Sequence, residues 1–162
     1  MMKHDNEDFE NSVLFVDDEI EVLQLLNQSL MDEDYKKFFA QSVEESMEII
    51  EKYPIDVLVT DIIIPGTNGL ELMKMIQDKH PKIIRIIISA HIQSKLVIAT
   101  INKLNVFKYI PKPWDADNDL KPAIREAINL YNYGKNKEKF NDSLATYSLR
   151  VVDKHATKGY IN

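Results

Sequence analysis

The chain has 162 residues, of which 44% are hydrophobic, so it can form a buried core and is not a wholly disordered protein. Its 20 basic and 26 acidic residues give a net charge of −6, which argues against a nucleic-acid surface spread over the whole molecule. There is no cysteine, which excludes a disulfide scaffold and a thiolate metal site. The 4 glycines are too few for a glycine-rich nucleotide-binding chain.

The N-terminus is polar and acidic, where a secretory signal peptide would need a basic start and an apolar run. No stretch approaches the ~18 consecutive apolar residues of a membrane span. The lack of cysteine suits a reducing compartment. We therefore expect a cytoplasmic protein with no membrane partner.

Five short apolar runs alternate with longer amphipathic segments. The runs are rich in β-branched and aromatic residues, as buried strands are, and they comprise residues 13–16, 37–40, 56–60, 83–89 and 106–110. The centres of the third and fourth runs show no polar alternation, which indicates strands that are covered on both faces. This is typical of a parallel sheet between two helix layers.

The intervening segments carry apolar residues at helical spacing. The five expected stripes are Ile20, Leu23, Leu26 and Leu30; Val43, Met47 and Ile50; Leu70, Met73 and Ile76; Leu96, Ile101 and Leu104; and Leu120, Ile124, Ile128 and Tyr131. Strand and helix alternating five times predict an α/β fold with a doubly wound, five-stranded parallel sheet. Such sheets bind ligands beyond the carboxyl ends of their strands.

Polar side chains follow four of the predicted strands at that edge. Asp17 and Asp18 end the first strand, Asp61 the third and Ser89 the fourth, and Lys112 follows the fifth. Each has an ordinary structural interpretation, as a helix cap, a turn residue or a solvated loop lysine. To dismiss a functional site, all of these structural interpretations would have to be true at once at the same edge of the sheet. We therefore favour a functional site.

The residue types at this edge indicate phosphoryl chemistry. Carboxylates without thiols or imidazoles form a hard oxygen site that suits Mg²⁺. A lysine opposite them would pair with a phosphate oxygen, and a serine hydroxyl would donate to another. Asp61 ends the central strand and is the expected nucleophile, which would form an aspartyl phosphate.

Four ordered segments resemble the receiver domain of two-component response regulators. They are FVDDE at 15–19, VTDIIIPGTNG at 59–69, IISA at 87–90 and YIPKPW at 109–114. The resemblance covers about residues 10–133. It implies the flavodoxin-like strand order 2-1-3-4-5 with helices on both faces of the sheet, followed here by a C-terminal helical extension.

The resemblance also implies roles for single residues. Asp61 matches the phosphoacceptor, which a histidine kinase or a phosphotransfer protein would phosphorylate. Asp18 matches the direct Mg²⁺ ligand, Asp17 a ligand that acts through water, and the backbone carbonyl of Ile63 the third protein ligand. The only catalysis implied is Mg²⁺-dependent phosphorylation and dephosphorylation of the chain itself, so we do not expect an enzyme with an external substrate.

Further matches concern the phosphoryl group, the switch that transmits the signal, and the subtype of receiver. Lys112 matches the lysine that pairs with the phosphoryl group, and the Lys112–Pro113 bond is usually cis in the family. Ser89 and Tyr109 match the switch pair, which would act on the fourth helix, fifth strand and fifth helix. Trp114 makes the chain similar to receivers with a Lys-Pro-Trp signature. The output domain or downstream protein is not identified.

The charge changes sign near Gly134, where residues 1–134 carry a net −9 and residues 135–162 a net +3. We expect a flexible extension over residues 1–10, a receiver over 11–133 and a helical tail or linker over 134–162. Phe140, Leu144, Tyr147 and Val151 predict a tail helix that forms a homodimer, packs on its own receiver or begins a truncated output domain. The tail is too short for a DNA-binding domain, so no direct contact with nucleic acid is expected.

Two other classes of function remain at this point. A phosphatase with an aspartate nucleophile would need a second acid two residues after Asp61, where the chain has Ile63. A phosphate-independent interaction domain would have no need for this set of acids, serine and lysine. Both therefore explain the sequence less well than a signalling receiver does.

Overall fold

The protein is described by a computed structural model, which covers residues 9–62, 69–90 and 95–154, with side chains as far as residue 139. The chain divides into two compact units, Met1–Tyr131 and Asn132–Asn162. The first unit contains the sheet, and the second contains the greater part of the last helix. Each unit is considered by itself below.

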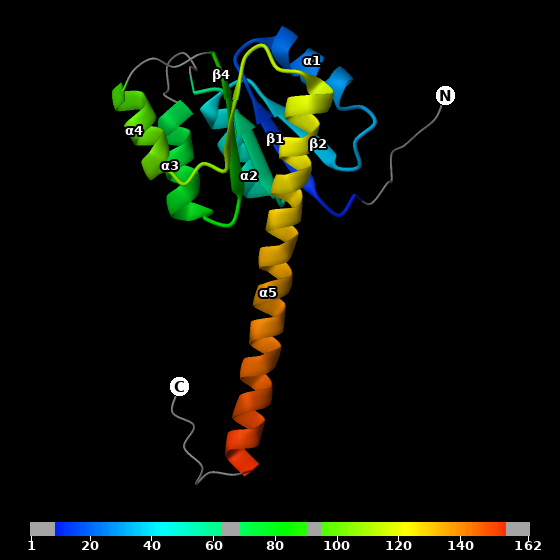
Figure 1. Ribbon diagram of the computed structural model, residues 1–162, viewed down its shortest axis with the longest axis vertical. Coiled ribbons are helices and arrows are strands. Elements are labelled where there is room, and N and C mark those ends of the chain that lie inside the picture. The colour runs from blue at the N-terminus through cyan, green and yellow to red at the C-terminus, as the bar shows by residue number, and fades with distance from the viewer. Residues whose placement is uncertain (1–8, 63–68, 91–94, 155–162) are drawn as a thin grey trace. The chain divides into compact units, whose positions relative to one another are not determined.

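The first unit is built on a five-stranded sheet (Figure 1). Its strands are β1 (Ser12–Val16), β2 (Lys36–Ala40), β3 (Val57–Thr60), β4 (Ile84–Ser89) and β5 (Lys108–Pro111). Their order is β2-β1-β3-β4-β5, and every neighbouring pair is parallel. The predicted fold class and strand order are confirmed.

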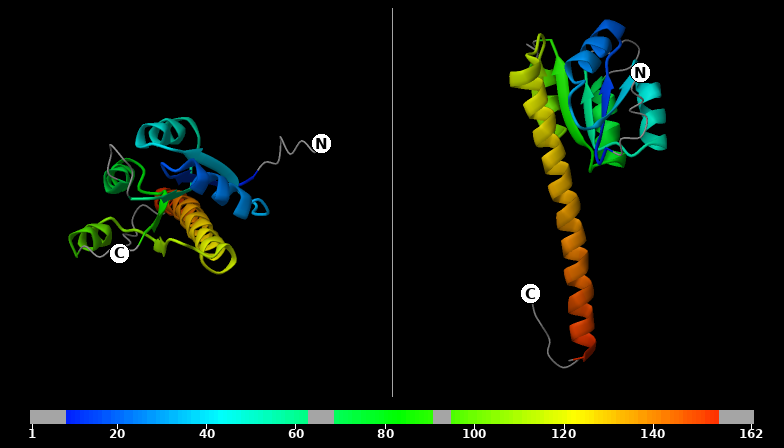
Figure 2. Two further views of the ribbon diagram at one scale, coloured as in Figure 1. Left: turned by 90° about the horizontal axis from the view of Figure 1, so that it is seen from above. Right: turned by 90° about the vertical axis from the view of Figure 1, so that its right-hand side faces the viewer.

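Helices cover both faces of the sheet (Figure 2). They are α1 (Ile20–Ser29), α2 (Val43–Lys52), α3 (Gly69–Lys79), α4 (Lys95–Lys103) and α5 (Lys121–Lys154). Helix α1 and the first turns of α5 pack on one face, and α2, α3 and α4 lie against the other. No helix in the described part of the chain is long and apolar enough to cross a membrane.

The continuous apolar runs are explained by these two layers. Along β3, Val57 and Val59 belong to the core beneath α1 and α5, whereas Leu58 belongs to the core beneath α2 and α3. Successive side chains of a strand point to opposite faces, so a strand covered on both sides needs an apolar residue at every position. The three residues are at most 2% exposed.

The C-terminal part of the chain differs from the expectation in one respect. Helix α5 runs from Lys121 to Lys154 and is not interrupted at Gly134. A single glycine costs a helix about 1 kcal/mol relative to alanine, and good helix formers follow Gly134, namely the lysines at 135, 137 and 139 and the glutamate at 138. The predicted tail helix is therefore the later part of a helix that begins in the first unit. A turn of π-helix, Ala116–Leu120, precedes α5 and was not expected from the sequence.

Candidate functional site

The register of the parallel strands places two acids side by side. Val16 of β1 is paired with Thr60 of β3, so Asp17 and Asp61 follow at the same level of the sheet. The backbone N–H of Asp61 donates to the Val16 carbonyl at 3.0 Å, which continues the pairing by one residue. Both acids are buried, at 3% and 7% exposure. Two buried carboxylates side by side repel each other, and a cation near both of them offsets this repulsion.

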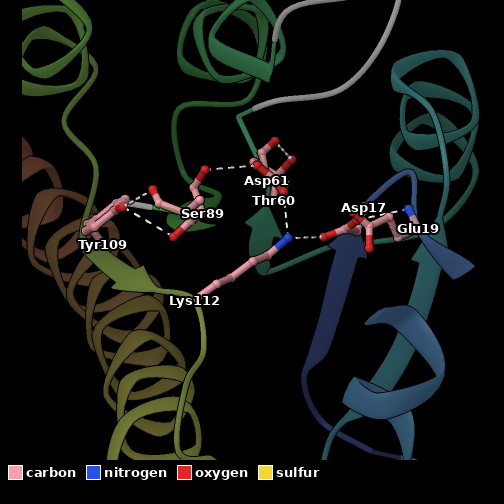
Figure 3. Close-up of polar contacts among 8 residues, drawn as sticks. Asp17, Glu19, Thr60, Asp61, Ser89, Tyr109 and Lys112 are labelled. Atoms are coloured by element: carbon pink, nitrogen blue, oxygen red, sulfur yellow. Dashed lines mark hydrogen bonds and ion pairs between the residues drawn. The ribbon is translucent and has the colours of Figure 1, made fainter. Parts of the chain in front are cut away.

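Lys112 supplies that positive charge from the end of β5 (Figure 3). Its Nζ lies 2.9 Å from Asp17 Oδ2 and 2.7 Å from Asp61 Oδ2. Burial by itself lowers the pKa of Lys112, but the hydrogen bonds and charges of Asp17 and Asp61 outweigh it and raise the pKa above its ordinary value. Lys112 is therefore a fixed cation of the site and not a solvated loop lysine.

The second oxygen of each carboxylate has a different kind of partner. Asp61 Oδ1 accepts a hydrogen bond from the Ser89 hydroxyl at 3.0 Å. Asp17 Oδ1 accepts from the backbone N–H of Glu19 at 2.9 Å. Ser89 is fully buried and lies six residues before α4 begins at Lys95, so it does not cap that helix. Asp17 is thus held in part by a backbone N–H, whereas Asp61 is bound by the side chains of Lys112 and Ser89.

Tyr109 lies beside Ser89. Its hydroxyl donates to the backbone carbonyl of Ala90 at 2.6 Å and lies 3.2 Å from that of Ser89. The tyrosine is 36% exposed. Tyr109 thus contacts the backbone that carries Ser89, on the opposite side of the serine from Asp61 (Figure 3).

One predicted metal ligand, Asp18, does not enter this network in the described part of the chain. Asp18 is half-buried, and its backbone carbonyl accepts from Gln41 Nε2 at 3.5 Å. Ile63, whose carbonyl is a predicted ligand, lies outside the described residues. The expectation that the Lys112–Pro113 bond is cis is confirmed.

The residues present fit a magnesium ion. Within residues 9–62, 69–90 and 95–154, no three acidic or histidine side chains are grouped so that they could hold a metal by themselves. Mg²⁺ does not need such a group, because it retains several waters and uses one or two carboxylates together with phosphate oxygens. Asp17 and Asp61 converge on one ammonium and supply the carboxylates that this kind of site requires.

Gly69 is a structural requirement of the site that sequence reasoning missed. It is the first residue of α3, and its N–H donates to the Ile62 carbonyl at 3.1 Å. A Cβ at this position would lie 2.5 Å from the backbone oxygen of Asp61 and 2.5 Å from Ile62 Cα. The absence of a side chain therefore lets α3 begin directly against the backbone of Asp61. Its place at the end of the 59–69 motif was the available signal.

A family model described as the response regulator receiver domain matches residues 13–125 of this chain. The chain belongs to this family. The match includes β1 from Val13 onward, the whole of the other four strands, and every residue of the Asp17, Asp61, Ser89 and Lys112 network. The receiver is a signalling domain of two-component systems. The resemblance to this family that was seen in the sequence is therefore confirmed.

Relatives of this receiver include much longer proteins. The hydrogenase transcriptional regulatory protein HoxA of Cupriavidus necator is 33% identical over 121 residues, which are 75% of this chain and 25% of HoxA. The regulatory protein VanR of Enterococcus faecium is 28% identical over 153 residues, which are 94% of this chain and 64% of VanR. The chain thus spans about a quarter of the length of HoxA.

A solved structure similar to this receiver is the response regulator protein TrrA of Thermotoga maritima, described as a complex with Mg²⁺ and BeF. It is 27% identical and aligns with a TM-score of 0.62, covering 72% of this chain and 98% of that chain.

Replacing Gly69 and Gly134 by alanine is expected to have opposite effects. Gly69→Ala forces α3 away from Asp61 and should lower the free energy of unfolding by about 1–3 kcal/mol. A Cβ at Gly134 meets nothing within 4 Å, so Gly134→Ala should stabilise the helix by up to about 1 kcal/mol. Thermal unfolding followed by circular dichroism measures both. A Gly69→Ala variant as stable as the native chain would contradict the close approach.

Proposed function

We propose that this receiver accepts a phosphoryl group on Asp61 from a histidine kinase or a phosphotransfer protein and passes the signal on through α4, β5 and α5. The observation that carries the proposal is the network in which Lys112 and Ser89 bind the two oxygens of one buried carboxylate. The family match supports the same conclusion. The chain would catalyse only its own phosphorylation and dephosphorylation.

Asp61 is a better nucleophile than Asp17 because of the groups that hold it. The Ser89 hydroxyl and the Lys112 ammonium can both move from a carboxylate oxygen to a phosphoryl oxygen. Asp17 is instead held in part by the backbone N–H of Glu19, which cannot follow an incoming group.

The transfer step can be written with its atoms balanced. A bond forms between an Asp61 oxygen and phosphorus while the phosphorus–nitrogen bond of the donor phosphohistidine breaks. The imidazole nitrogen keeps the electron pair of the broken bond. Lys112 neutralises part of the charge on the transferred group, and Ser89 donates to one of its oxygens.

Charge balance calls for a divalent cation. Asp17, Asp61 and Lys112 together carry one negative charge, and phosphorylation of Asp61 adds a further one in a largely buried place. When bound, Mg²⁺ would offset this charge and bind the oxygens of the phosphoryl group. In this proposal Asp18, Asp61 and the Ile63 carbonyl bind the ion directly and Asp17 binds through water. TrrA is described as a complex with Mg²⁺ and BeF, which supports a magnesium ion at this site, whereas the choice of single ligands follows from the resemblance seen in the sequence.

The conformational response would begin at Ser89. If its hydroxyl turns from Asp61 towards a phosphoryl oxygen, the β4 end moves, and the Ser89 and Ala90 carbonyls that Tyr109 contacts move with it. Helix α4 lies next in the chain, and none of its residues Lys95–Lys103 is buried. A helix with so little buried surface is the element of the domain that can shift at the lowest cost.

The signal would then pass to an output domain or a partner protein. HoxA is a hydrogenase transcriptional regulatory protein by name, and the similar protein NtrC of Escherichia coli is a DNA-binding transcriptional regulator by name. A transcriptional output is the type of output that these relatives favour. Trp114 packs in part against the core beneath α1 and α5, which fits a receiver of the Lys-Pro-Trp type. A cytoplasmic location is part of the proposal.

Asp61→Asn should abolish labelling by a small-molecule phosphodonor such as acetyl phosphate, because the amide is not a nucleophile. Glu19→Gln changes an exposed acid of the same loop and should leave labelling unchanged. Labelling is measured on gels that retard phosphoproteins. Each sample is run with and without hydroxylamine, which cleaves an acyl phosphate. Undiminished labelling of Asp61→Asn would refute the proposed phosphoacceptor.

Ser89→Ala should separate phosphorylation from the conformational response. Loss of one hydrogen bond slows labelling by about tenfold or less, whereas the amide NMR shifts of β5 should no longer change on phosphorylation. Ser29→Ala, at the end of α1, is the matched control and should retain both properties. If β5 shifts as strongly in phosphorylated Ser89→Ala as in the native chain, Ser89 does not transmit the signal.

A further inference from the structure

The later part of α5 carries a heptad pattern that the phosphorylation site does not explain. Seven residues follow one another along the helix at spacings that alternate between three and four residues. They are Leu130, Tyr133, Lys137, Phe140, Leu144, Tyr147 and Val151. These are the a and d positions of a coiled coil, with Leu130, Lys137, Leu144 and Val151 at a. We call these seven positions the heptad seam. All but Lys137 are apolar or aromatic.

The described part of the heptad seam lies open to solvent. Tyr133 is 65% exposed and Leu130 is 43% exposed. Large apolar side chains in successive a and d positions of one helix mark a surface that another helix covers. The seam spans 22 residues, or about 33 Å of helix. This is just over three heptads, which is about the minimum for a coiled coil.

We propose that the heptad seam binds the same segment of a second copy of this chain, forming a parallel two-stranded coiled coil. The residues that flank the seam favour this partner. Its e and g positions are Gly134, Asn136, Asn141, Ser143, Ser148 and Arg150. In a parallel pair each g residue faces the following e residue of the other helix, so small polar groups meet one another and Arg150 is the one charge among them. Apart from Lys137, no charge in or beside the seam opposes its counterpart in an identical helix, and no charge pattern selects a different partner.

Lys137 favours the parallel arrangement. In a parallel, in-register pair, the two copies of Lys137 share one layer of the seam, and their ammonium groups can extend to solvent. In an antiparallel pair, a positions face d positions, so the two lysines would interrupt two separate layers. With so few layers in all, the parallel pair loses less apolar packing. A single lysine at an a position also fixes register at a cost in stability.

The mass of the full chain in solution tests this proposal. Sedimentation equilibrium should give a concentration-dependent mass that approaches twice 18.8 kDa. Leu144→Asp places a charge in the seam and should weaken association by about a hundredfold or more. Ala145→Asp introduces the same charge at the neighbouring b position and should leave association unchanged. A monomer at all concentrations, as expected if the helix packs on its own receiver or awaits another partner, would overturn the proposal. A trimer or tetramer would also overturn it.

Orientation is tested by disulfide formation, since the native chain has no cysteine. Tyr147→Cys at a d position should give covalent dimers on oxidation, because equivalent d residues meet in a parallel pair. Leu149→Cys at an f position should give few. Failure of Tyr147→Cys to cross-link in a chain that still dimerises would overturn the parallel arrangement. None of these measurements depends on phosphorylation of Asp61, so each proposal can fail without the other.

Discussion

The ammonium group of Lys112 holds the functional end of this domain together. It contacts carboxylates from two neighbouring strands while its own backbone follows a third, and the side chains of Asp17 and Asp61 are at most 9% exposed. Two buried carboxylates without such a partner would repel each other at a cost of several kcal/mol. The parallel register brings the two acids together, and the lysine offsets the electrostatic repulsion between them.

The same interaction suits the phosphoryl transfer that we propose for this site. The three charged groups carry a net charge of −1, and in the proposed function a divalent cation would offset this charge together with that of the phosphoryl group. The partners of Asp61 include a hydroxyl and an ammonium group, each of which can pair with a new oxygen acceptor, whereas Asp17 is held in part by a backbone N–H. A change at Asp61 therefore alters the pairing of Ser89, and the Ser89 backbone is in contact with Tyr109. In the proposed function, charge balance and signal transmission would therefore depend on one set of hydrogen bonds.

The sequence was sufficient for the fold and for most of the residues that meet at the site. Continuous apolar runs predicted covered parallel strands, and parallel strands bring their carboxyl ends to one edge, so the proximity of Asp17, Asp61, Ser89 and Lys112 followed. The particular hydrogen bonds did not follow, because they depend on side-chain rotamers. The role of Gly69 was missed although the 59–69 motif ends on it, because the close approach of α3 to the backbone of Asp61 appears only in the folded chain. The continuity of α5 through Gly134 was not predicted, because the change of composition there does not say whether a helix ends.

The central claim is that Asp61 holds a phosphoryl group in a site completed by a divalent cation. Beryllofluoride mimics that group, and its binding can be followed by fluorine NMR. The account predicts bound signals only when Mg²⁺ is present, and their loss in Asp61→Asn. Bound signals of equal strength without Mg²⁺, or in Asp61→Asn, would contradict it.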